Sequence, residues 1–228
     1  MSGRIPPVSN VPVTGESLRA LIGVGAKCVL EIGAHHGTHT LMLLDAFPVA
    51  SVHAFEPDLR ALEKHRKSVC SPRATLHAMA IGAVNGRADF HVSSGMPPGI
   101  DPMTAANYPK GWDQSGSLRA PKEHRNAHPW CRFARTISVE VRTLDAWAAK
   151  HARGAIDFIW ADMQGAEGDL VRGGAATLQR TRFLYCEYSD QELYEGEPTL
   201  AALLDMLPAW EVVRRFPNDV LIRNMACL

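Results

Sequence analysis

The chain has 228 residues, of which 46% are hydrophobic and 21% are charged, a balance typical of one globular domain with a single core. Its 24 basic and 24 acidic residues give a formal net charge of zero, which argues against a broad surface for binding nucleic acid. The N-terminus lacks the apolar core of a signal peptide, and no apolar run is long enough to cross a membrane. We therefore expect a cytoplasmic protein that binds neither nucleic acid nor membranes.

The cysteines are odd in number and scattered, and no two of them have the close spacing of a zinc knuckle. They are Cys28, Cys70, Cys131, Cys186 and Cys227. This usage indicates reduced thiols rather than a disulfide framework.

The first part of the chain predicts an arm over residues 1–24, followed by one α/β domain over residues 25–228. The arm is rich in Pro and Val and ends in a short helix at 16–22. Strands and helices then alternate, which predicts a parallel sheet with helices on both faces. The expected elements are a strand at 29–32, a helix at 38–47 with Thr38 as its N-cap, a strand at 52–55, a helix at 58–69 and a strand at 75–80.

An insertion at about 94–135 interrupts the alternation between two half-exposed strands at 87–93 and 136–142. It is rich in Gly, Pro, Asn and His, and it contains the aromatic residues Tyr108, Trp112 and Trp130. A loop of this length in a compact domain is commonly functional. We interpret the insertion as a lid or as a wall of the substrate site.

The last part of the chain returns to alternation and ends in a hairpin. The expected elements are helices at 144–151, 164–171 and 199–207, strands at 156–161 and 183–186, and paired strands at 211–216 and 220–223 around Pro217-Asn218-Asp219. An antiparallel hairpin at the end of an otherwise parallel sheet distinguishes this pattern from an ordinary dinucleotide-binding fold.

Two strand ends carry the strongest signal for function. Gly33 and Gly37 form a turn after the strand at 29–32, and Glu56 ends the next strand, where a carboxylate can bind the hydroxyls of a ribose. The Gly-x-x-x-Gly spacing differs from the Gly-x-Gly-x-x-Gly of dinucleotide folds. A nucleoside such as S-adenosylmethionine is therefore favoured over NAD, which predicts a methyltransferase. An NAD-type oxidoreductase and a non-catalytic nucleoside-binding protein are the alternatives.

Four segments resemble the FkbM family of S-adenosylmethionine-dependent methyltransferases. They are Glu31–Gly37, Phe55–Pro57, Thr143–Asp145 and Asp162–Glu167. The resemblance implies a Rossmann-like class I methyltransferase fold, with a seven-stranded, mostly parallel sheet whose last strand is antiparallel. It also implies O-methylation of a sugar or natural-product hydroxyl. The chain departs from the family pattern at Gln164, where the family has Glu, and at Glu31, where Asp is more frequent.

The resemblance also implies which residues hold the cofactor. Glu31 would lie near its methionine end, Glu56 would bind the ribose, and Ala80 and Ile81 would contact the adenine. Ser117 belongs to a small-residue segment that reaches the cofactor in this family. The turn residues Gly33, Ala34, Gly37, Thr38 and Pro57 complete the expected site.

Candidate catalytic residues lie at two further strand ends and in the insertion. Asp162 and Glu187 end their strands at the edge where ligands of open α/β sheets bind. With Asp190 they could bind a divalent cation such as Mg²⁺, which would lower the pKa of a substrate hydroxyl, or they could hydrogen-bond a sugar directly. His124 and His128 are alternative general bases, since histidine titrates near neutral pH.

A histidine cluster, His35, His36 and His39, lies beside the glycine turn. A zinc site would need a further ligand that the neighbouring sequence does not supply, so we interpret these residues as turn residues. The expected partner is a small-molecule or oligosaccharide acceptor. The Pro-rich arm and the aromatic insertion make a homodimer a further expectation.

Overall fold

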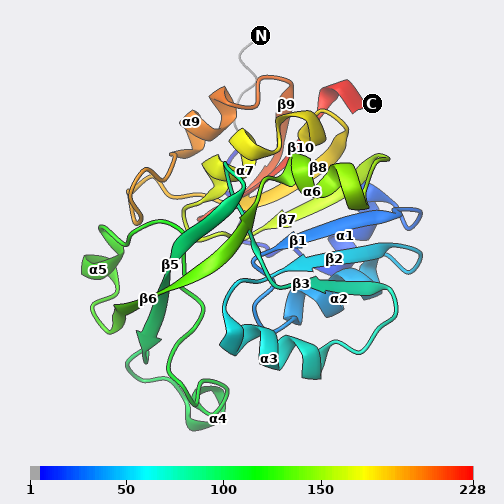
Figure 1. The fold of residues 1–228 in the computed structure, drawn as a ribbon. Helices are drawn as coiled ribbons and strands as arrows, with labels where there is room; N and C mark the ends of the chain where they lie inside the picture. Colours follow the sequence, from blue (N-terminus) through cyan, green and yellow to red (C-terminus); the bar gives the residue numbers. More distant parts are fainter. Residues whose placement is uncertain (1–5, 228) are drawn as a thin grey trace.

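The computed structural model describes residues 6–227, and its centre is a seven-stranded sheet (Figure 1). The strands are β1 (Cys28–Ile32), β2 (Ser51–Phe55), β3 (Ala74–His77), β7 (Ile156–Ala161), β8 (Thr181–Glu187), β9 (Trp210–Arg215) and β10 (Asp219–Asn224). Their order is β3-β2-β1-β7-β8-β10-β9. Neighbouring strands from β3 to β8 are parallel, whereas β10 is antiparallel to both β8 and β9. The predicted sheet with an antiparallel C-terminal hairpin is confirmed.

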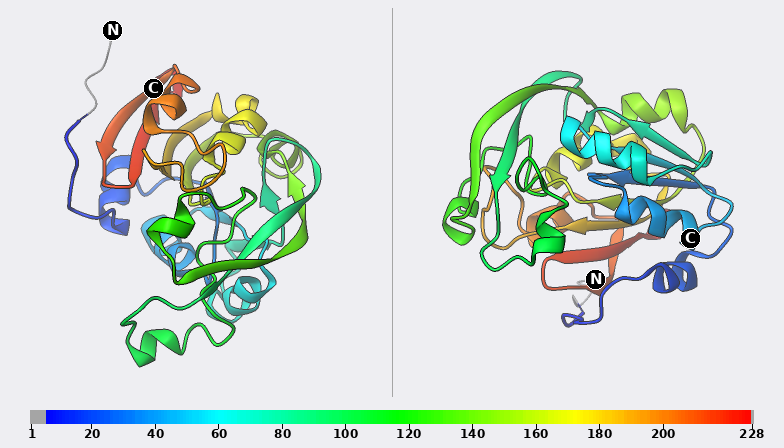
Figure 2. Two further views of the ribbon diagram at one scale, coloured as in Figure 1. Left: turned by 90° about the vertical axis from the view of Figure 1, so that its left-hand side faces the viewer. Right: turned by 90° about the horizontal axis from the view of Figure 1, so that it is seen from below.

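Helices cover both faces of this sheet (Figure 2). Helices α1 (Gly15–Ile22) and α2 (Thr38–Ala46) pack on one face, and α6 (Leu144–His151), α7 (Glu167–Gly173), α8 (Ala175–Leu178) and α9 (Leu200–Asp205) pack on the other. Consecutive strand residues point to opposite faces. Val29 and Phe158 therefore join the core beneath α1 and α2, while Leu30 and Ile159 join the core beneath α6 to α9.

A small second sheet holds the insertion. It consists of β4 (Ala80–Ile81), β5 (Gly86–Gly95) and β6 (Cys131–Arg142), in the order β4-β6-β5. The predicted strand at 75–80 is thus wrong at its end. Strand β3 stops at His77, which pairs with Phe55, the last residue of β2. Ala80 belongs to the second sheet, where it pairs with Val141 of β6. Because β5 and β6 extend beyond the predicted strands, the loop between them spans 96–130, including the short helices α4 (Pro102–Ala105) and α5 (His124–Ala127).

Two predicted helix starts are corrected. The N-cap of α2 is Gly37, at φ 89°, so Thr38 is the first helical residue rather than the cap. Helix α7 begins at Glu167 rather than at 164, because Gln164 and Gly165 have φ values of 53° and 87°, which a right-handed helix cannot contain. Helix α3 (Leu59–Ser68) is capped by the Asp58 side chain, which accepts from the Arg60 N–H at 2.9 Å.

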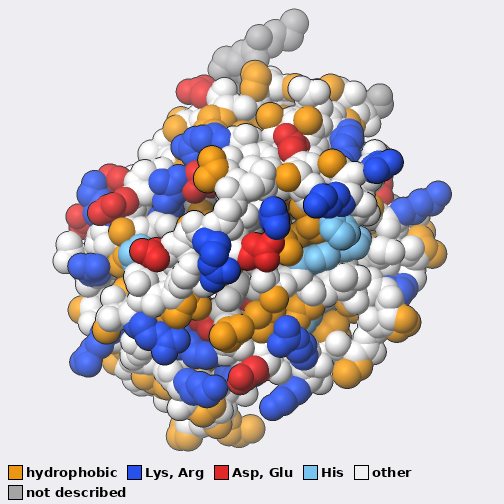
Figure 3. Space-filling view, viewed as in Figure 1, with side chains coloured by type: hydrophobic (Ala, Val, Ile, Leu, Met, Phe, Trp, Pro, Cys, Tyr) orange, Lys and Arg blue, Asp and Glu red, His pale blue; other side chains and the backbone are white. Residues whose placement is uncertain are grey.

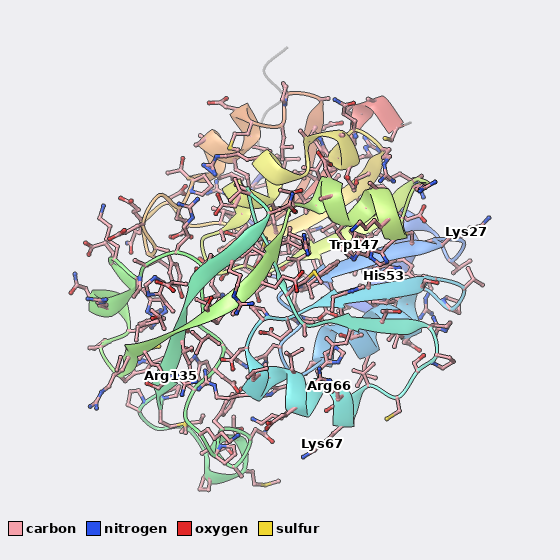
Figure 4. The ribbon with its side chains drawn as sticks, in the orientation of Figure 1. Lys27, His53, Arg66, Lys67, Arg135 and Trp147 are labelled. Atoms are coloured by element: carbon pink, nitrogen blue, oxygen red, sulfur yellow. The ribbon has the colours of Figure 1, made fainter. Side chains whose placement is uncertain are left out.

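Aromatic side chains pack α6 against β2 and β3. Trp147 of α6 and His53 of β2 lie side by side in Figure 4, with ring centroids 5.0 Å apart. On the face drawn in Figure 3, Lys and Arg side chains are scattered among acidic and hydrophobic ones. The five cysteines are free. Within residues 6–227, the helices are all too short or too polar to cross a membrane, including the C-terminal 3₁₀ turn Met225–Cys227.

Candidate functional site

A cavity of about 870 Å³ opens at the carboxyl ends of β1, β2, β7 and β8, under the insertion. In Figure 1 these strand ends and the insertion lie together on the left of the sheet. The expected site residues on its wall are Gly33, Ala34, Thr38, Glu56, Pro57, Ala80, Ile81, His124, His128, Asp162, Glu187 and Asp190. Its size is within the range of small-molecule sites in proteins.

The glycine turn after β1 packs so closely against neighbouring parts of the chain that two of its positions have no room for a side chain. Gly33 has φ 90°, and a Cβ atom there would lie 1.9 Å from the backbone oxygen of Asp162. A Cβ atom on Gly37 would lie 2.5 Å from the Val69 side chain, and Gly37 does not line the cavity. The N–H groups of Gly33 and Ala34 donate to the Phe55 oxygen at 3.0 and 2.9 Å. These contacts hold the turn across the ends of β2 and β7.

Glu56 lies on the cavity wall with both carboxylate oxygens in use. Oε2 accepts from the His35 N–H at 2.9 Å, and Oε1 accepts from the Asp58 N–H at 2.7 Å. Burial raises its pKa to about 8, although these two N–H groups oppose the rise. Each carboxylate oxygen can accept a second hydrogen bond. Glu56 is therefore oriented to receive hydroxyl groups from a ligand in the cavity.

An apolar part of the cavity lies next to Glu56. Ala80 and Ile81 of β4 line it together with Met79, Phe55 and Phe90. Four of these side chains come from β2, β4 and β5, and Met79 precedes β4. Ala80 and Ile81 are placed there because the chain leaves the main sheet after β3 and β4 pairs with β6. A flat apolar group such as a nucleobase fits a wall of this composition.

Three expected cofactor residues do not line the cavity, namely Gly37, Glu31 and Ser117. Glu31 is completely buried, and its Oε2 accepts from the Thr40 hydroxyl, while its Oε1 has no partner. Burial raises its pKa to about 8. Ser117 donates its hydroxyl to the backbone oxygen of Gln164 at 2.7 Å, and its neighbours Ser115 and Gly116 face the cavity instead.

Asp162 and Glu187 meet on the opposite wall, joined by Gln164. The Gln164 amide nitrogen donates to Asp162 Oδ1 and to Glu187 Oε2, both at 2.8 Å, and its oxygen accepts from the Tyr194 hydroxyl at 3.1 Å. Burial and the neighbouring Asp162 carboxylate raise the pKa of Glu187 well above its usual range. The sequence-predicted pair is thus brought together, and Gln164 fixes its geometry.

The structure does not gather the predicted metal trio. Asp190 lines the cavity but lies 3.5 Å from Arg215 Nη2, and it forms no three-ligand group with Asp162 and Glu187. Among residues 6–227, one group of three potential ligands has its donor atoms within 4.8 Å of one another: His35, His36 and Asp113. Asp113, from the insertion, is the third ligand that the sequence near the histidines did not supply.

His124 and His128 both line the cavity, and their rings lie 4.8 Å apart. Burial, followed by the neighbouring His128, lowers the pKa of His124 to about 4, so its imidazole is neutral at physiological pH. Its Nδ1 atom has no hydrogen-bond partner, and its ring lies 5.2 Å from that of Tyr194. A neutral imidazole of low basicity suits hydrogen bonding to an acceptor better than proton abstraction.

Sequence reasoning missed the roles of Gln164, Tyr194 and Asp113. In the sequence, Gln164 stands out only as a departure from the family pattern, and Tyr194 has no local signal that links it to Gln164, 30 positions away. Asp113 carries no local signal, since its partner His35 is 78 positions away along the chain. Of the three, only Gln164 could have been singled out from the sequence, because it departs from the family pattern just after a strand end that carries a candidate catalytic residue.

Comparison with known protein sequences identifies the family of the chain. Residues 31–215 match the methyltransferase FkbM domain. The 2-O-methyltransferase NoeI of Sinorhizobium fredii (strain NBRC 101917 / NGR234) is 45% identical over 201 residues, which are 86% of this chain and 79% of NoeI.

Solved structures share the fold at low sequence identity. One, assigned as an rRNA-methylase of Clostridium thermocellum, has a TM-score of 0.50 at 10% identity and covers 95% of this chain and 98% of its own. Another, assigned as an O-methyltransferase of Klebsiella pneumoniae, has a TM-score of 0.50 at 13% identity and covers 95% and 83%. The predicted Rossmann-like fold and the predicted enzyme class, an S-adenosylmethionine-dependent O-methyltransferase, are confirmed. The chain belongs to the FkbM family of methyltransferases.

Proposed function

We propose that this enzyme methylates a hydroxyl group of a sugar residue, in an oligosaccharide or a glycosylated small molecule. The observation that carries the proposal is that one cavity is lined on one side by Glu56 and an apolar wall and on the other by Asp162, Glu187 and Tyr194. The name of the relative NoeI, a 2-O-methyltransferase, supports a hydroxyl acceptor. Carboxylates beside an aromatic ring are groups that can hydrogen-bond and pack against a sugar.

Glu56 and the apolar wall are the residues that would hold S-adenosylmethionine. The free lone pairs of Glu56 would accept from the ribose hydroxyls, and Ala80 and Ile81 would contact the adenine. Glu31 does not line the cavity, and it would act indirectly, through the Thr40 hydroxyl that donates to its Oε2 in the first turn of α2. The bound cofactor supplies an activated methyl group, so the protein need only align the acceptor with it.

The Asp162–Glu187 pair would accept the proton that the hydroxyl loses. Gln164 donates to both carboxylates and leaves their other oxygens for the acceptor. Both residues line the cavity, and Glu187 lies at the end of β8 beside Tyr188. A Mg²⁺ ion between the two carboxylates is a second form of this proposal, and it would require the Gln164 amide to move aside.

The cofactor assignment is tested by calorimetric titration of the protein with S-adenosylhomocysteine, with and without Mg²⁺. We expect binding by the wild type and a loss of at least about tenfold in affinity for Glu56→Ala, which removes a fixed hydrogen-bond acceptor. Glu16→Ala, an exposed glutamate in the first turn of α1, is the matched control. Equal affinity of Glu56→Ala and wild type would contradict the ribose role.

The acceptor assignment is tested with S-adenosylmethionine and a panel of methyl glycosides of hexoses and 6-deoxyhexoses, with products detected by mass spectrometry. We expect one methyl group on a ring hydroxyl of at least one glycoside. Methylation of phenolic or amine compounds alone would redirect the proposal to another acceptor class. A rate that rises with Mg²⁺ and falls with chelator would support the cation form.

A further inference from the structure

The side chains of His35, His36 and Asp113 form a cluster of metal-binding donor atoms beside the proposed cofactor residues. Their nitrogen and oxygen donor atoms all lie within 4.8 Å of one another. The histidines belong to the turn after β1, whereas Asp113 belongs to the insertion, 78 and 77 positions further along the chain. The fold thus assembles, from two distant segments, the number of protein ligands that an open zinc site uses.

The contacts within this cluster have the spacing of a coordination shell. His35 Nε2 lies 2.7 Å from Asp113 Oδ1, and His36 Nε2 lies 3.1 Å from Oδ2. In a tetrahedral zinc site, ligand atoms about 2.0–2.1 Å from the ion lie about 3.3 Å from one another. The imidazole rings stack with planes 21° apart, so they must turn apart for both lone pairs to converge on one ion. The two histidine side chains are 23% and 15% exposed, which leaves room for this rotation.

The Asp113 carboxylate is buried, with a side chain only 2% exposed, and its nearby ammonium group has other partners. Lys64 Nζ lies 3.8 Å from Asp113 Oδ2, farther than the about 2.7–2.9 Å of a direct charge-assisted hydrogen bond. The same ammonium donates to the Asn107 oxygen and lies 5.2 Å from the centre of the Tyr108 ring. A cation bound at the carboxylate would therefore leave Lys64 with partners of its own.

Neighbouring aromatic rings fix which histidines belong to the cluster. The Tyr108 ring packs against both of its imidazoles, with centroids 6.4 Å from that of His35 and 5.7 Å from that of His36. The third histidine of the turn, His39, packs instead against Trp160, with ring centroids 4.4 Å apart. The protein thus offers three ligands, and a water molecule would complete a tetrahedral shell.

We infer that His35, His36 and Asp113 bind one zinc ion, or a divalent transition-metal ion of similar chemistry, which joins the turn after β1 to the insertion. Imidazole nitrogens with a carboxylate oxygen are ligands that suit Zn²⁺, whereas Mg²⁺ prefers oxygen ligands alone. The site shares no residue with the Asp162–Glu187 pair. The ion would therefore act as a structural clamp, whether or not the acceptor wall binds Mg²⁺.

The clamp would also act on the cofactor half of the cavity. The His35 N–H donates to Glu56 Oε2 at 2.9 Å, so an ion that fixes the His35 side chain also restrains this donor. This consequence rests on the proposed role of Glu56. We expect Zn²⁺ to tighten the binding of S-adenosylhomocysteine several-fold, and S-adenosylhomocysteine to tighten the binding of Zn²⁺ by the same factor, because such coupling is reciprocal.

Metal binding is tested first without any measurement of activity. The protein is stripped with a chelator and dialysed against Zn²⁺ or Co²⁺, and the bound metal is counted by mass spectrometry of the elements. The visible absorption of bound Co²⁺ reports its coordination. We expect one ion per chain and a melting temperature that rises with Zn²⁺ and not with Mg²⁺.

Three variants assign the ion to this cluster. His36→Gln removes a ligand but keeps a side-chain donor for Asp113, so the fold should persist while zinc affinity falls by at least about tenfold. Lys64→Gln should raise zinc affinity several-fold, because it removes a like charge beside the site. His151→Gln is the matched control. This exposed histidine of α6 lies beside His77 and outside the cluster, and its loss should leave zinc affinity unchanged.

The outcomes separate the metal site from the proposed function. A wild-type protein that retains neither Zn²⁺ nor Co²⁺, or a His36→Gln variant that binds zinc as tightly, would overturn the site. Loss of zinc from His151→Gln instead would place the ion at the other histidines, which also overturns it. Zinc that depends on His36 but leaves the affinity for S-adenosylhomocysteine unchanged would overturn the coupling alone. Failure of Glu56→Ala to weaken S-adenosylhomocysteine binding would contradict the proposed function and not the metal site.

Discussion

The Nε2 atom of His35 lies 2.7 Å from Oδ1 of Asp113 and joins the turn after β1 to the insertion. His36 Nε2 lies 3.1 Å from Oδ2 of the same carboxylate, and the two imidazole rings stack with centroids 3.5 Å apart. Each imidazole ring thus contacts a different oxygen of the Asp113 carboxylate. Since the backbone N–H of His35 also donates to Glu56, Asp113 helps to hold the residue that orients Glu56.

We expect Asp113→Asn to weaken both folding and cofactor binding. Burial alone would raise the pKa of Asp113, but hydrogen bonds from His35 and His36 outweigh it and hold that pKa well below its usual range. Asparagine keeps one oxygen that can accept but replaces the other by an NH₂ group and removes the charge, so the free energy of unfolding should fall by about 1.5–3 kcal/mol, the value of one hydrogen bond to a charged acceptor. Thermal unfolding and titration with S-adenosylhomocysteine measure the two effects.

Asp89→Asn is the matched control, because Asp89 is exposed on β5 and does not line the cavity. If zinc were bound by His35, His36 and Asp113, added Zn²⁺ would raise the melting temperature of the wild type and not that of Asp113→Asn. If Asp113→Asn bound S-adenosylhomocysteine with unchanged affinity, Asp113 would have no role in orienting Glu56 for cofactor binding.

We expect the ligand-free protein to lose stability as pH rises from 6.5 to 8. Burial raises the pKa values of Glu31, Glu56 and Glu167 to about 8, so the folded state keeps protons that the unfolded state releases near pH 4.5. This stabilisation is complete below the unfolded pKa and is lost as pH rises through the folded one. The slope is up to about 1.4 kcal/mol per pH unit for each retained proton.

Glu167→Gln isolates one of these groups. Its Oε1 atom accepts from the Met163 N–H at 2.8 Å, and a glutamine can keep that bond without titrating. Chemical unfolding at pH 6.5, 7 and 8 should show a shallower pH dependence than in the wild type, and Glu16→Gln should behave as the wild type. A wild-type protein that is more stable at pH 8 than at 6.5 would contradict the assignment.

We expect Gln164→Glu to lower kcat by at least about tenfold, because it replaces two donated hydrogen bonds with a third negative charge between Asp162 and Glu187. Three carboxylates should also create a cation site, so Mg²⁺ should bind the variant more tightly than the wild type. Calorimetry with Mg²⁺ and initial rates measure these changes, with exposed Gln179→Glu as the control. Full activity of Gln164→Glu without Mg²⁺ would show that the Gln164 amide is not needed to hold Asp162 and Glu187 in place.

We expect Gly33→Ala to destabilise the fold by more than about 2 kcal/mol, because φ is 90° and the new Cβ would lie 1.9 Å from the Asp162 oxygen. Gly154→Ala is the control, since a Cβ atom there meets nothing within 4 Å. Differential scanning calorimetry of both variants gives the comparison. Equal melting temperatures of Gly33→Ala and Gly154→Ala would show that the turn can move away from the Asp162 backbone without loss of stability.

The positions of the main-sheet strands along the chain and the carboxylates near their ends followed from the sequence, because alternation and turn residues are local signals. Glu56, Asp162 and Glu187 were placed on one cavity because parallel strands bring their carboxyl ends to one edge. The main errors came where the chain leaves the regular pattern. Residues 75–81 are divided between two sheets, and pairing with β6, about sixty positions away in sequence, decides the division.

Roles that depend on distant partners were not predictable. Glu31 is the penultimate residue of β1, whereas Glu56 directly follows β2. The Glu31 side chain points into the layer of α2 and accepts from Thr40, because consecutive strand residues face opposite sides. Ser117 lies in the expected segment, but its hydroxyl faces Gln164 rather than the cavity. Side-chain direction within a loop is set by tertiary contacts, and no local pattern encodes it.

The insertion is anchored along its length, which makes it a fixed wall. Ser117 bridges to His91 of β5, Lys122 N–H donates to the Leu193 oxygen at 2.8 Å, and Asp113 holds the turn after β1. Trp112, next to Asp113, is part of this anchoring: its N–H donates to the Gly95 oxygen at 2.9 Å, and its indole nitrogen donates to the Ser115 hydroxyl at 3.1 Å. If the insertion is the acceptor wall, as proposed, the residues that would contact the acceptor are tied through Asp113 to the turn beside Glu56, so a change in one half of the cavity is transmitted to the other.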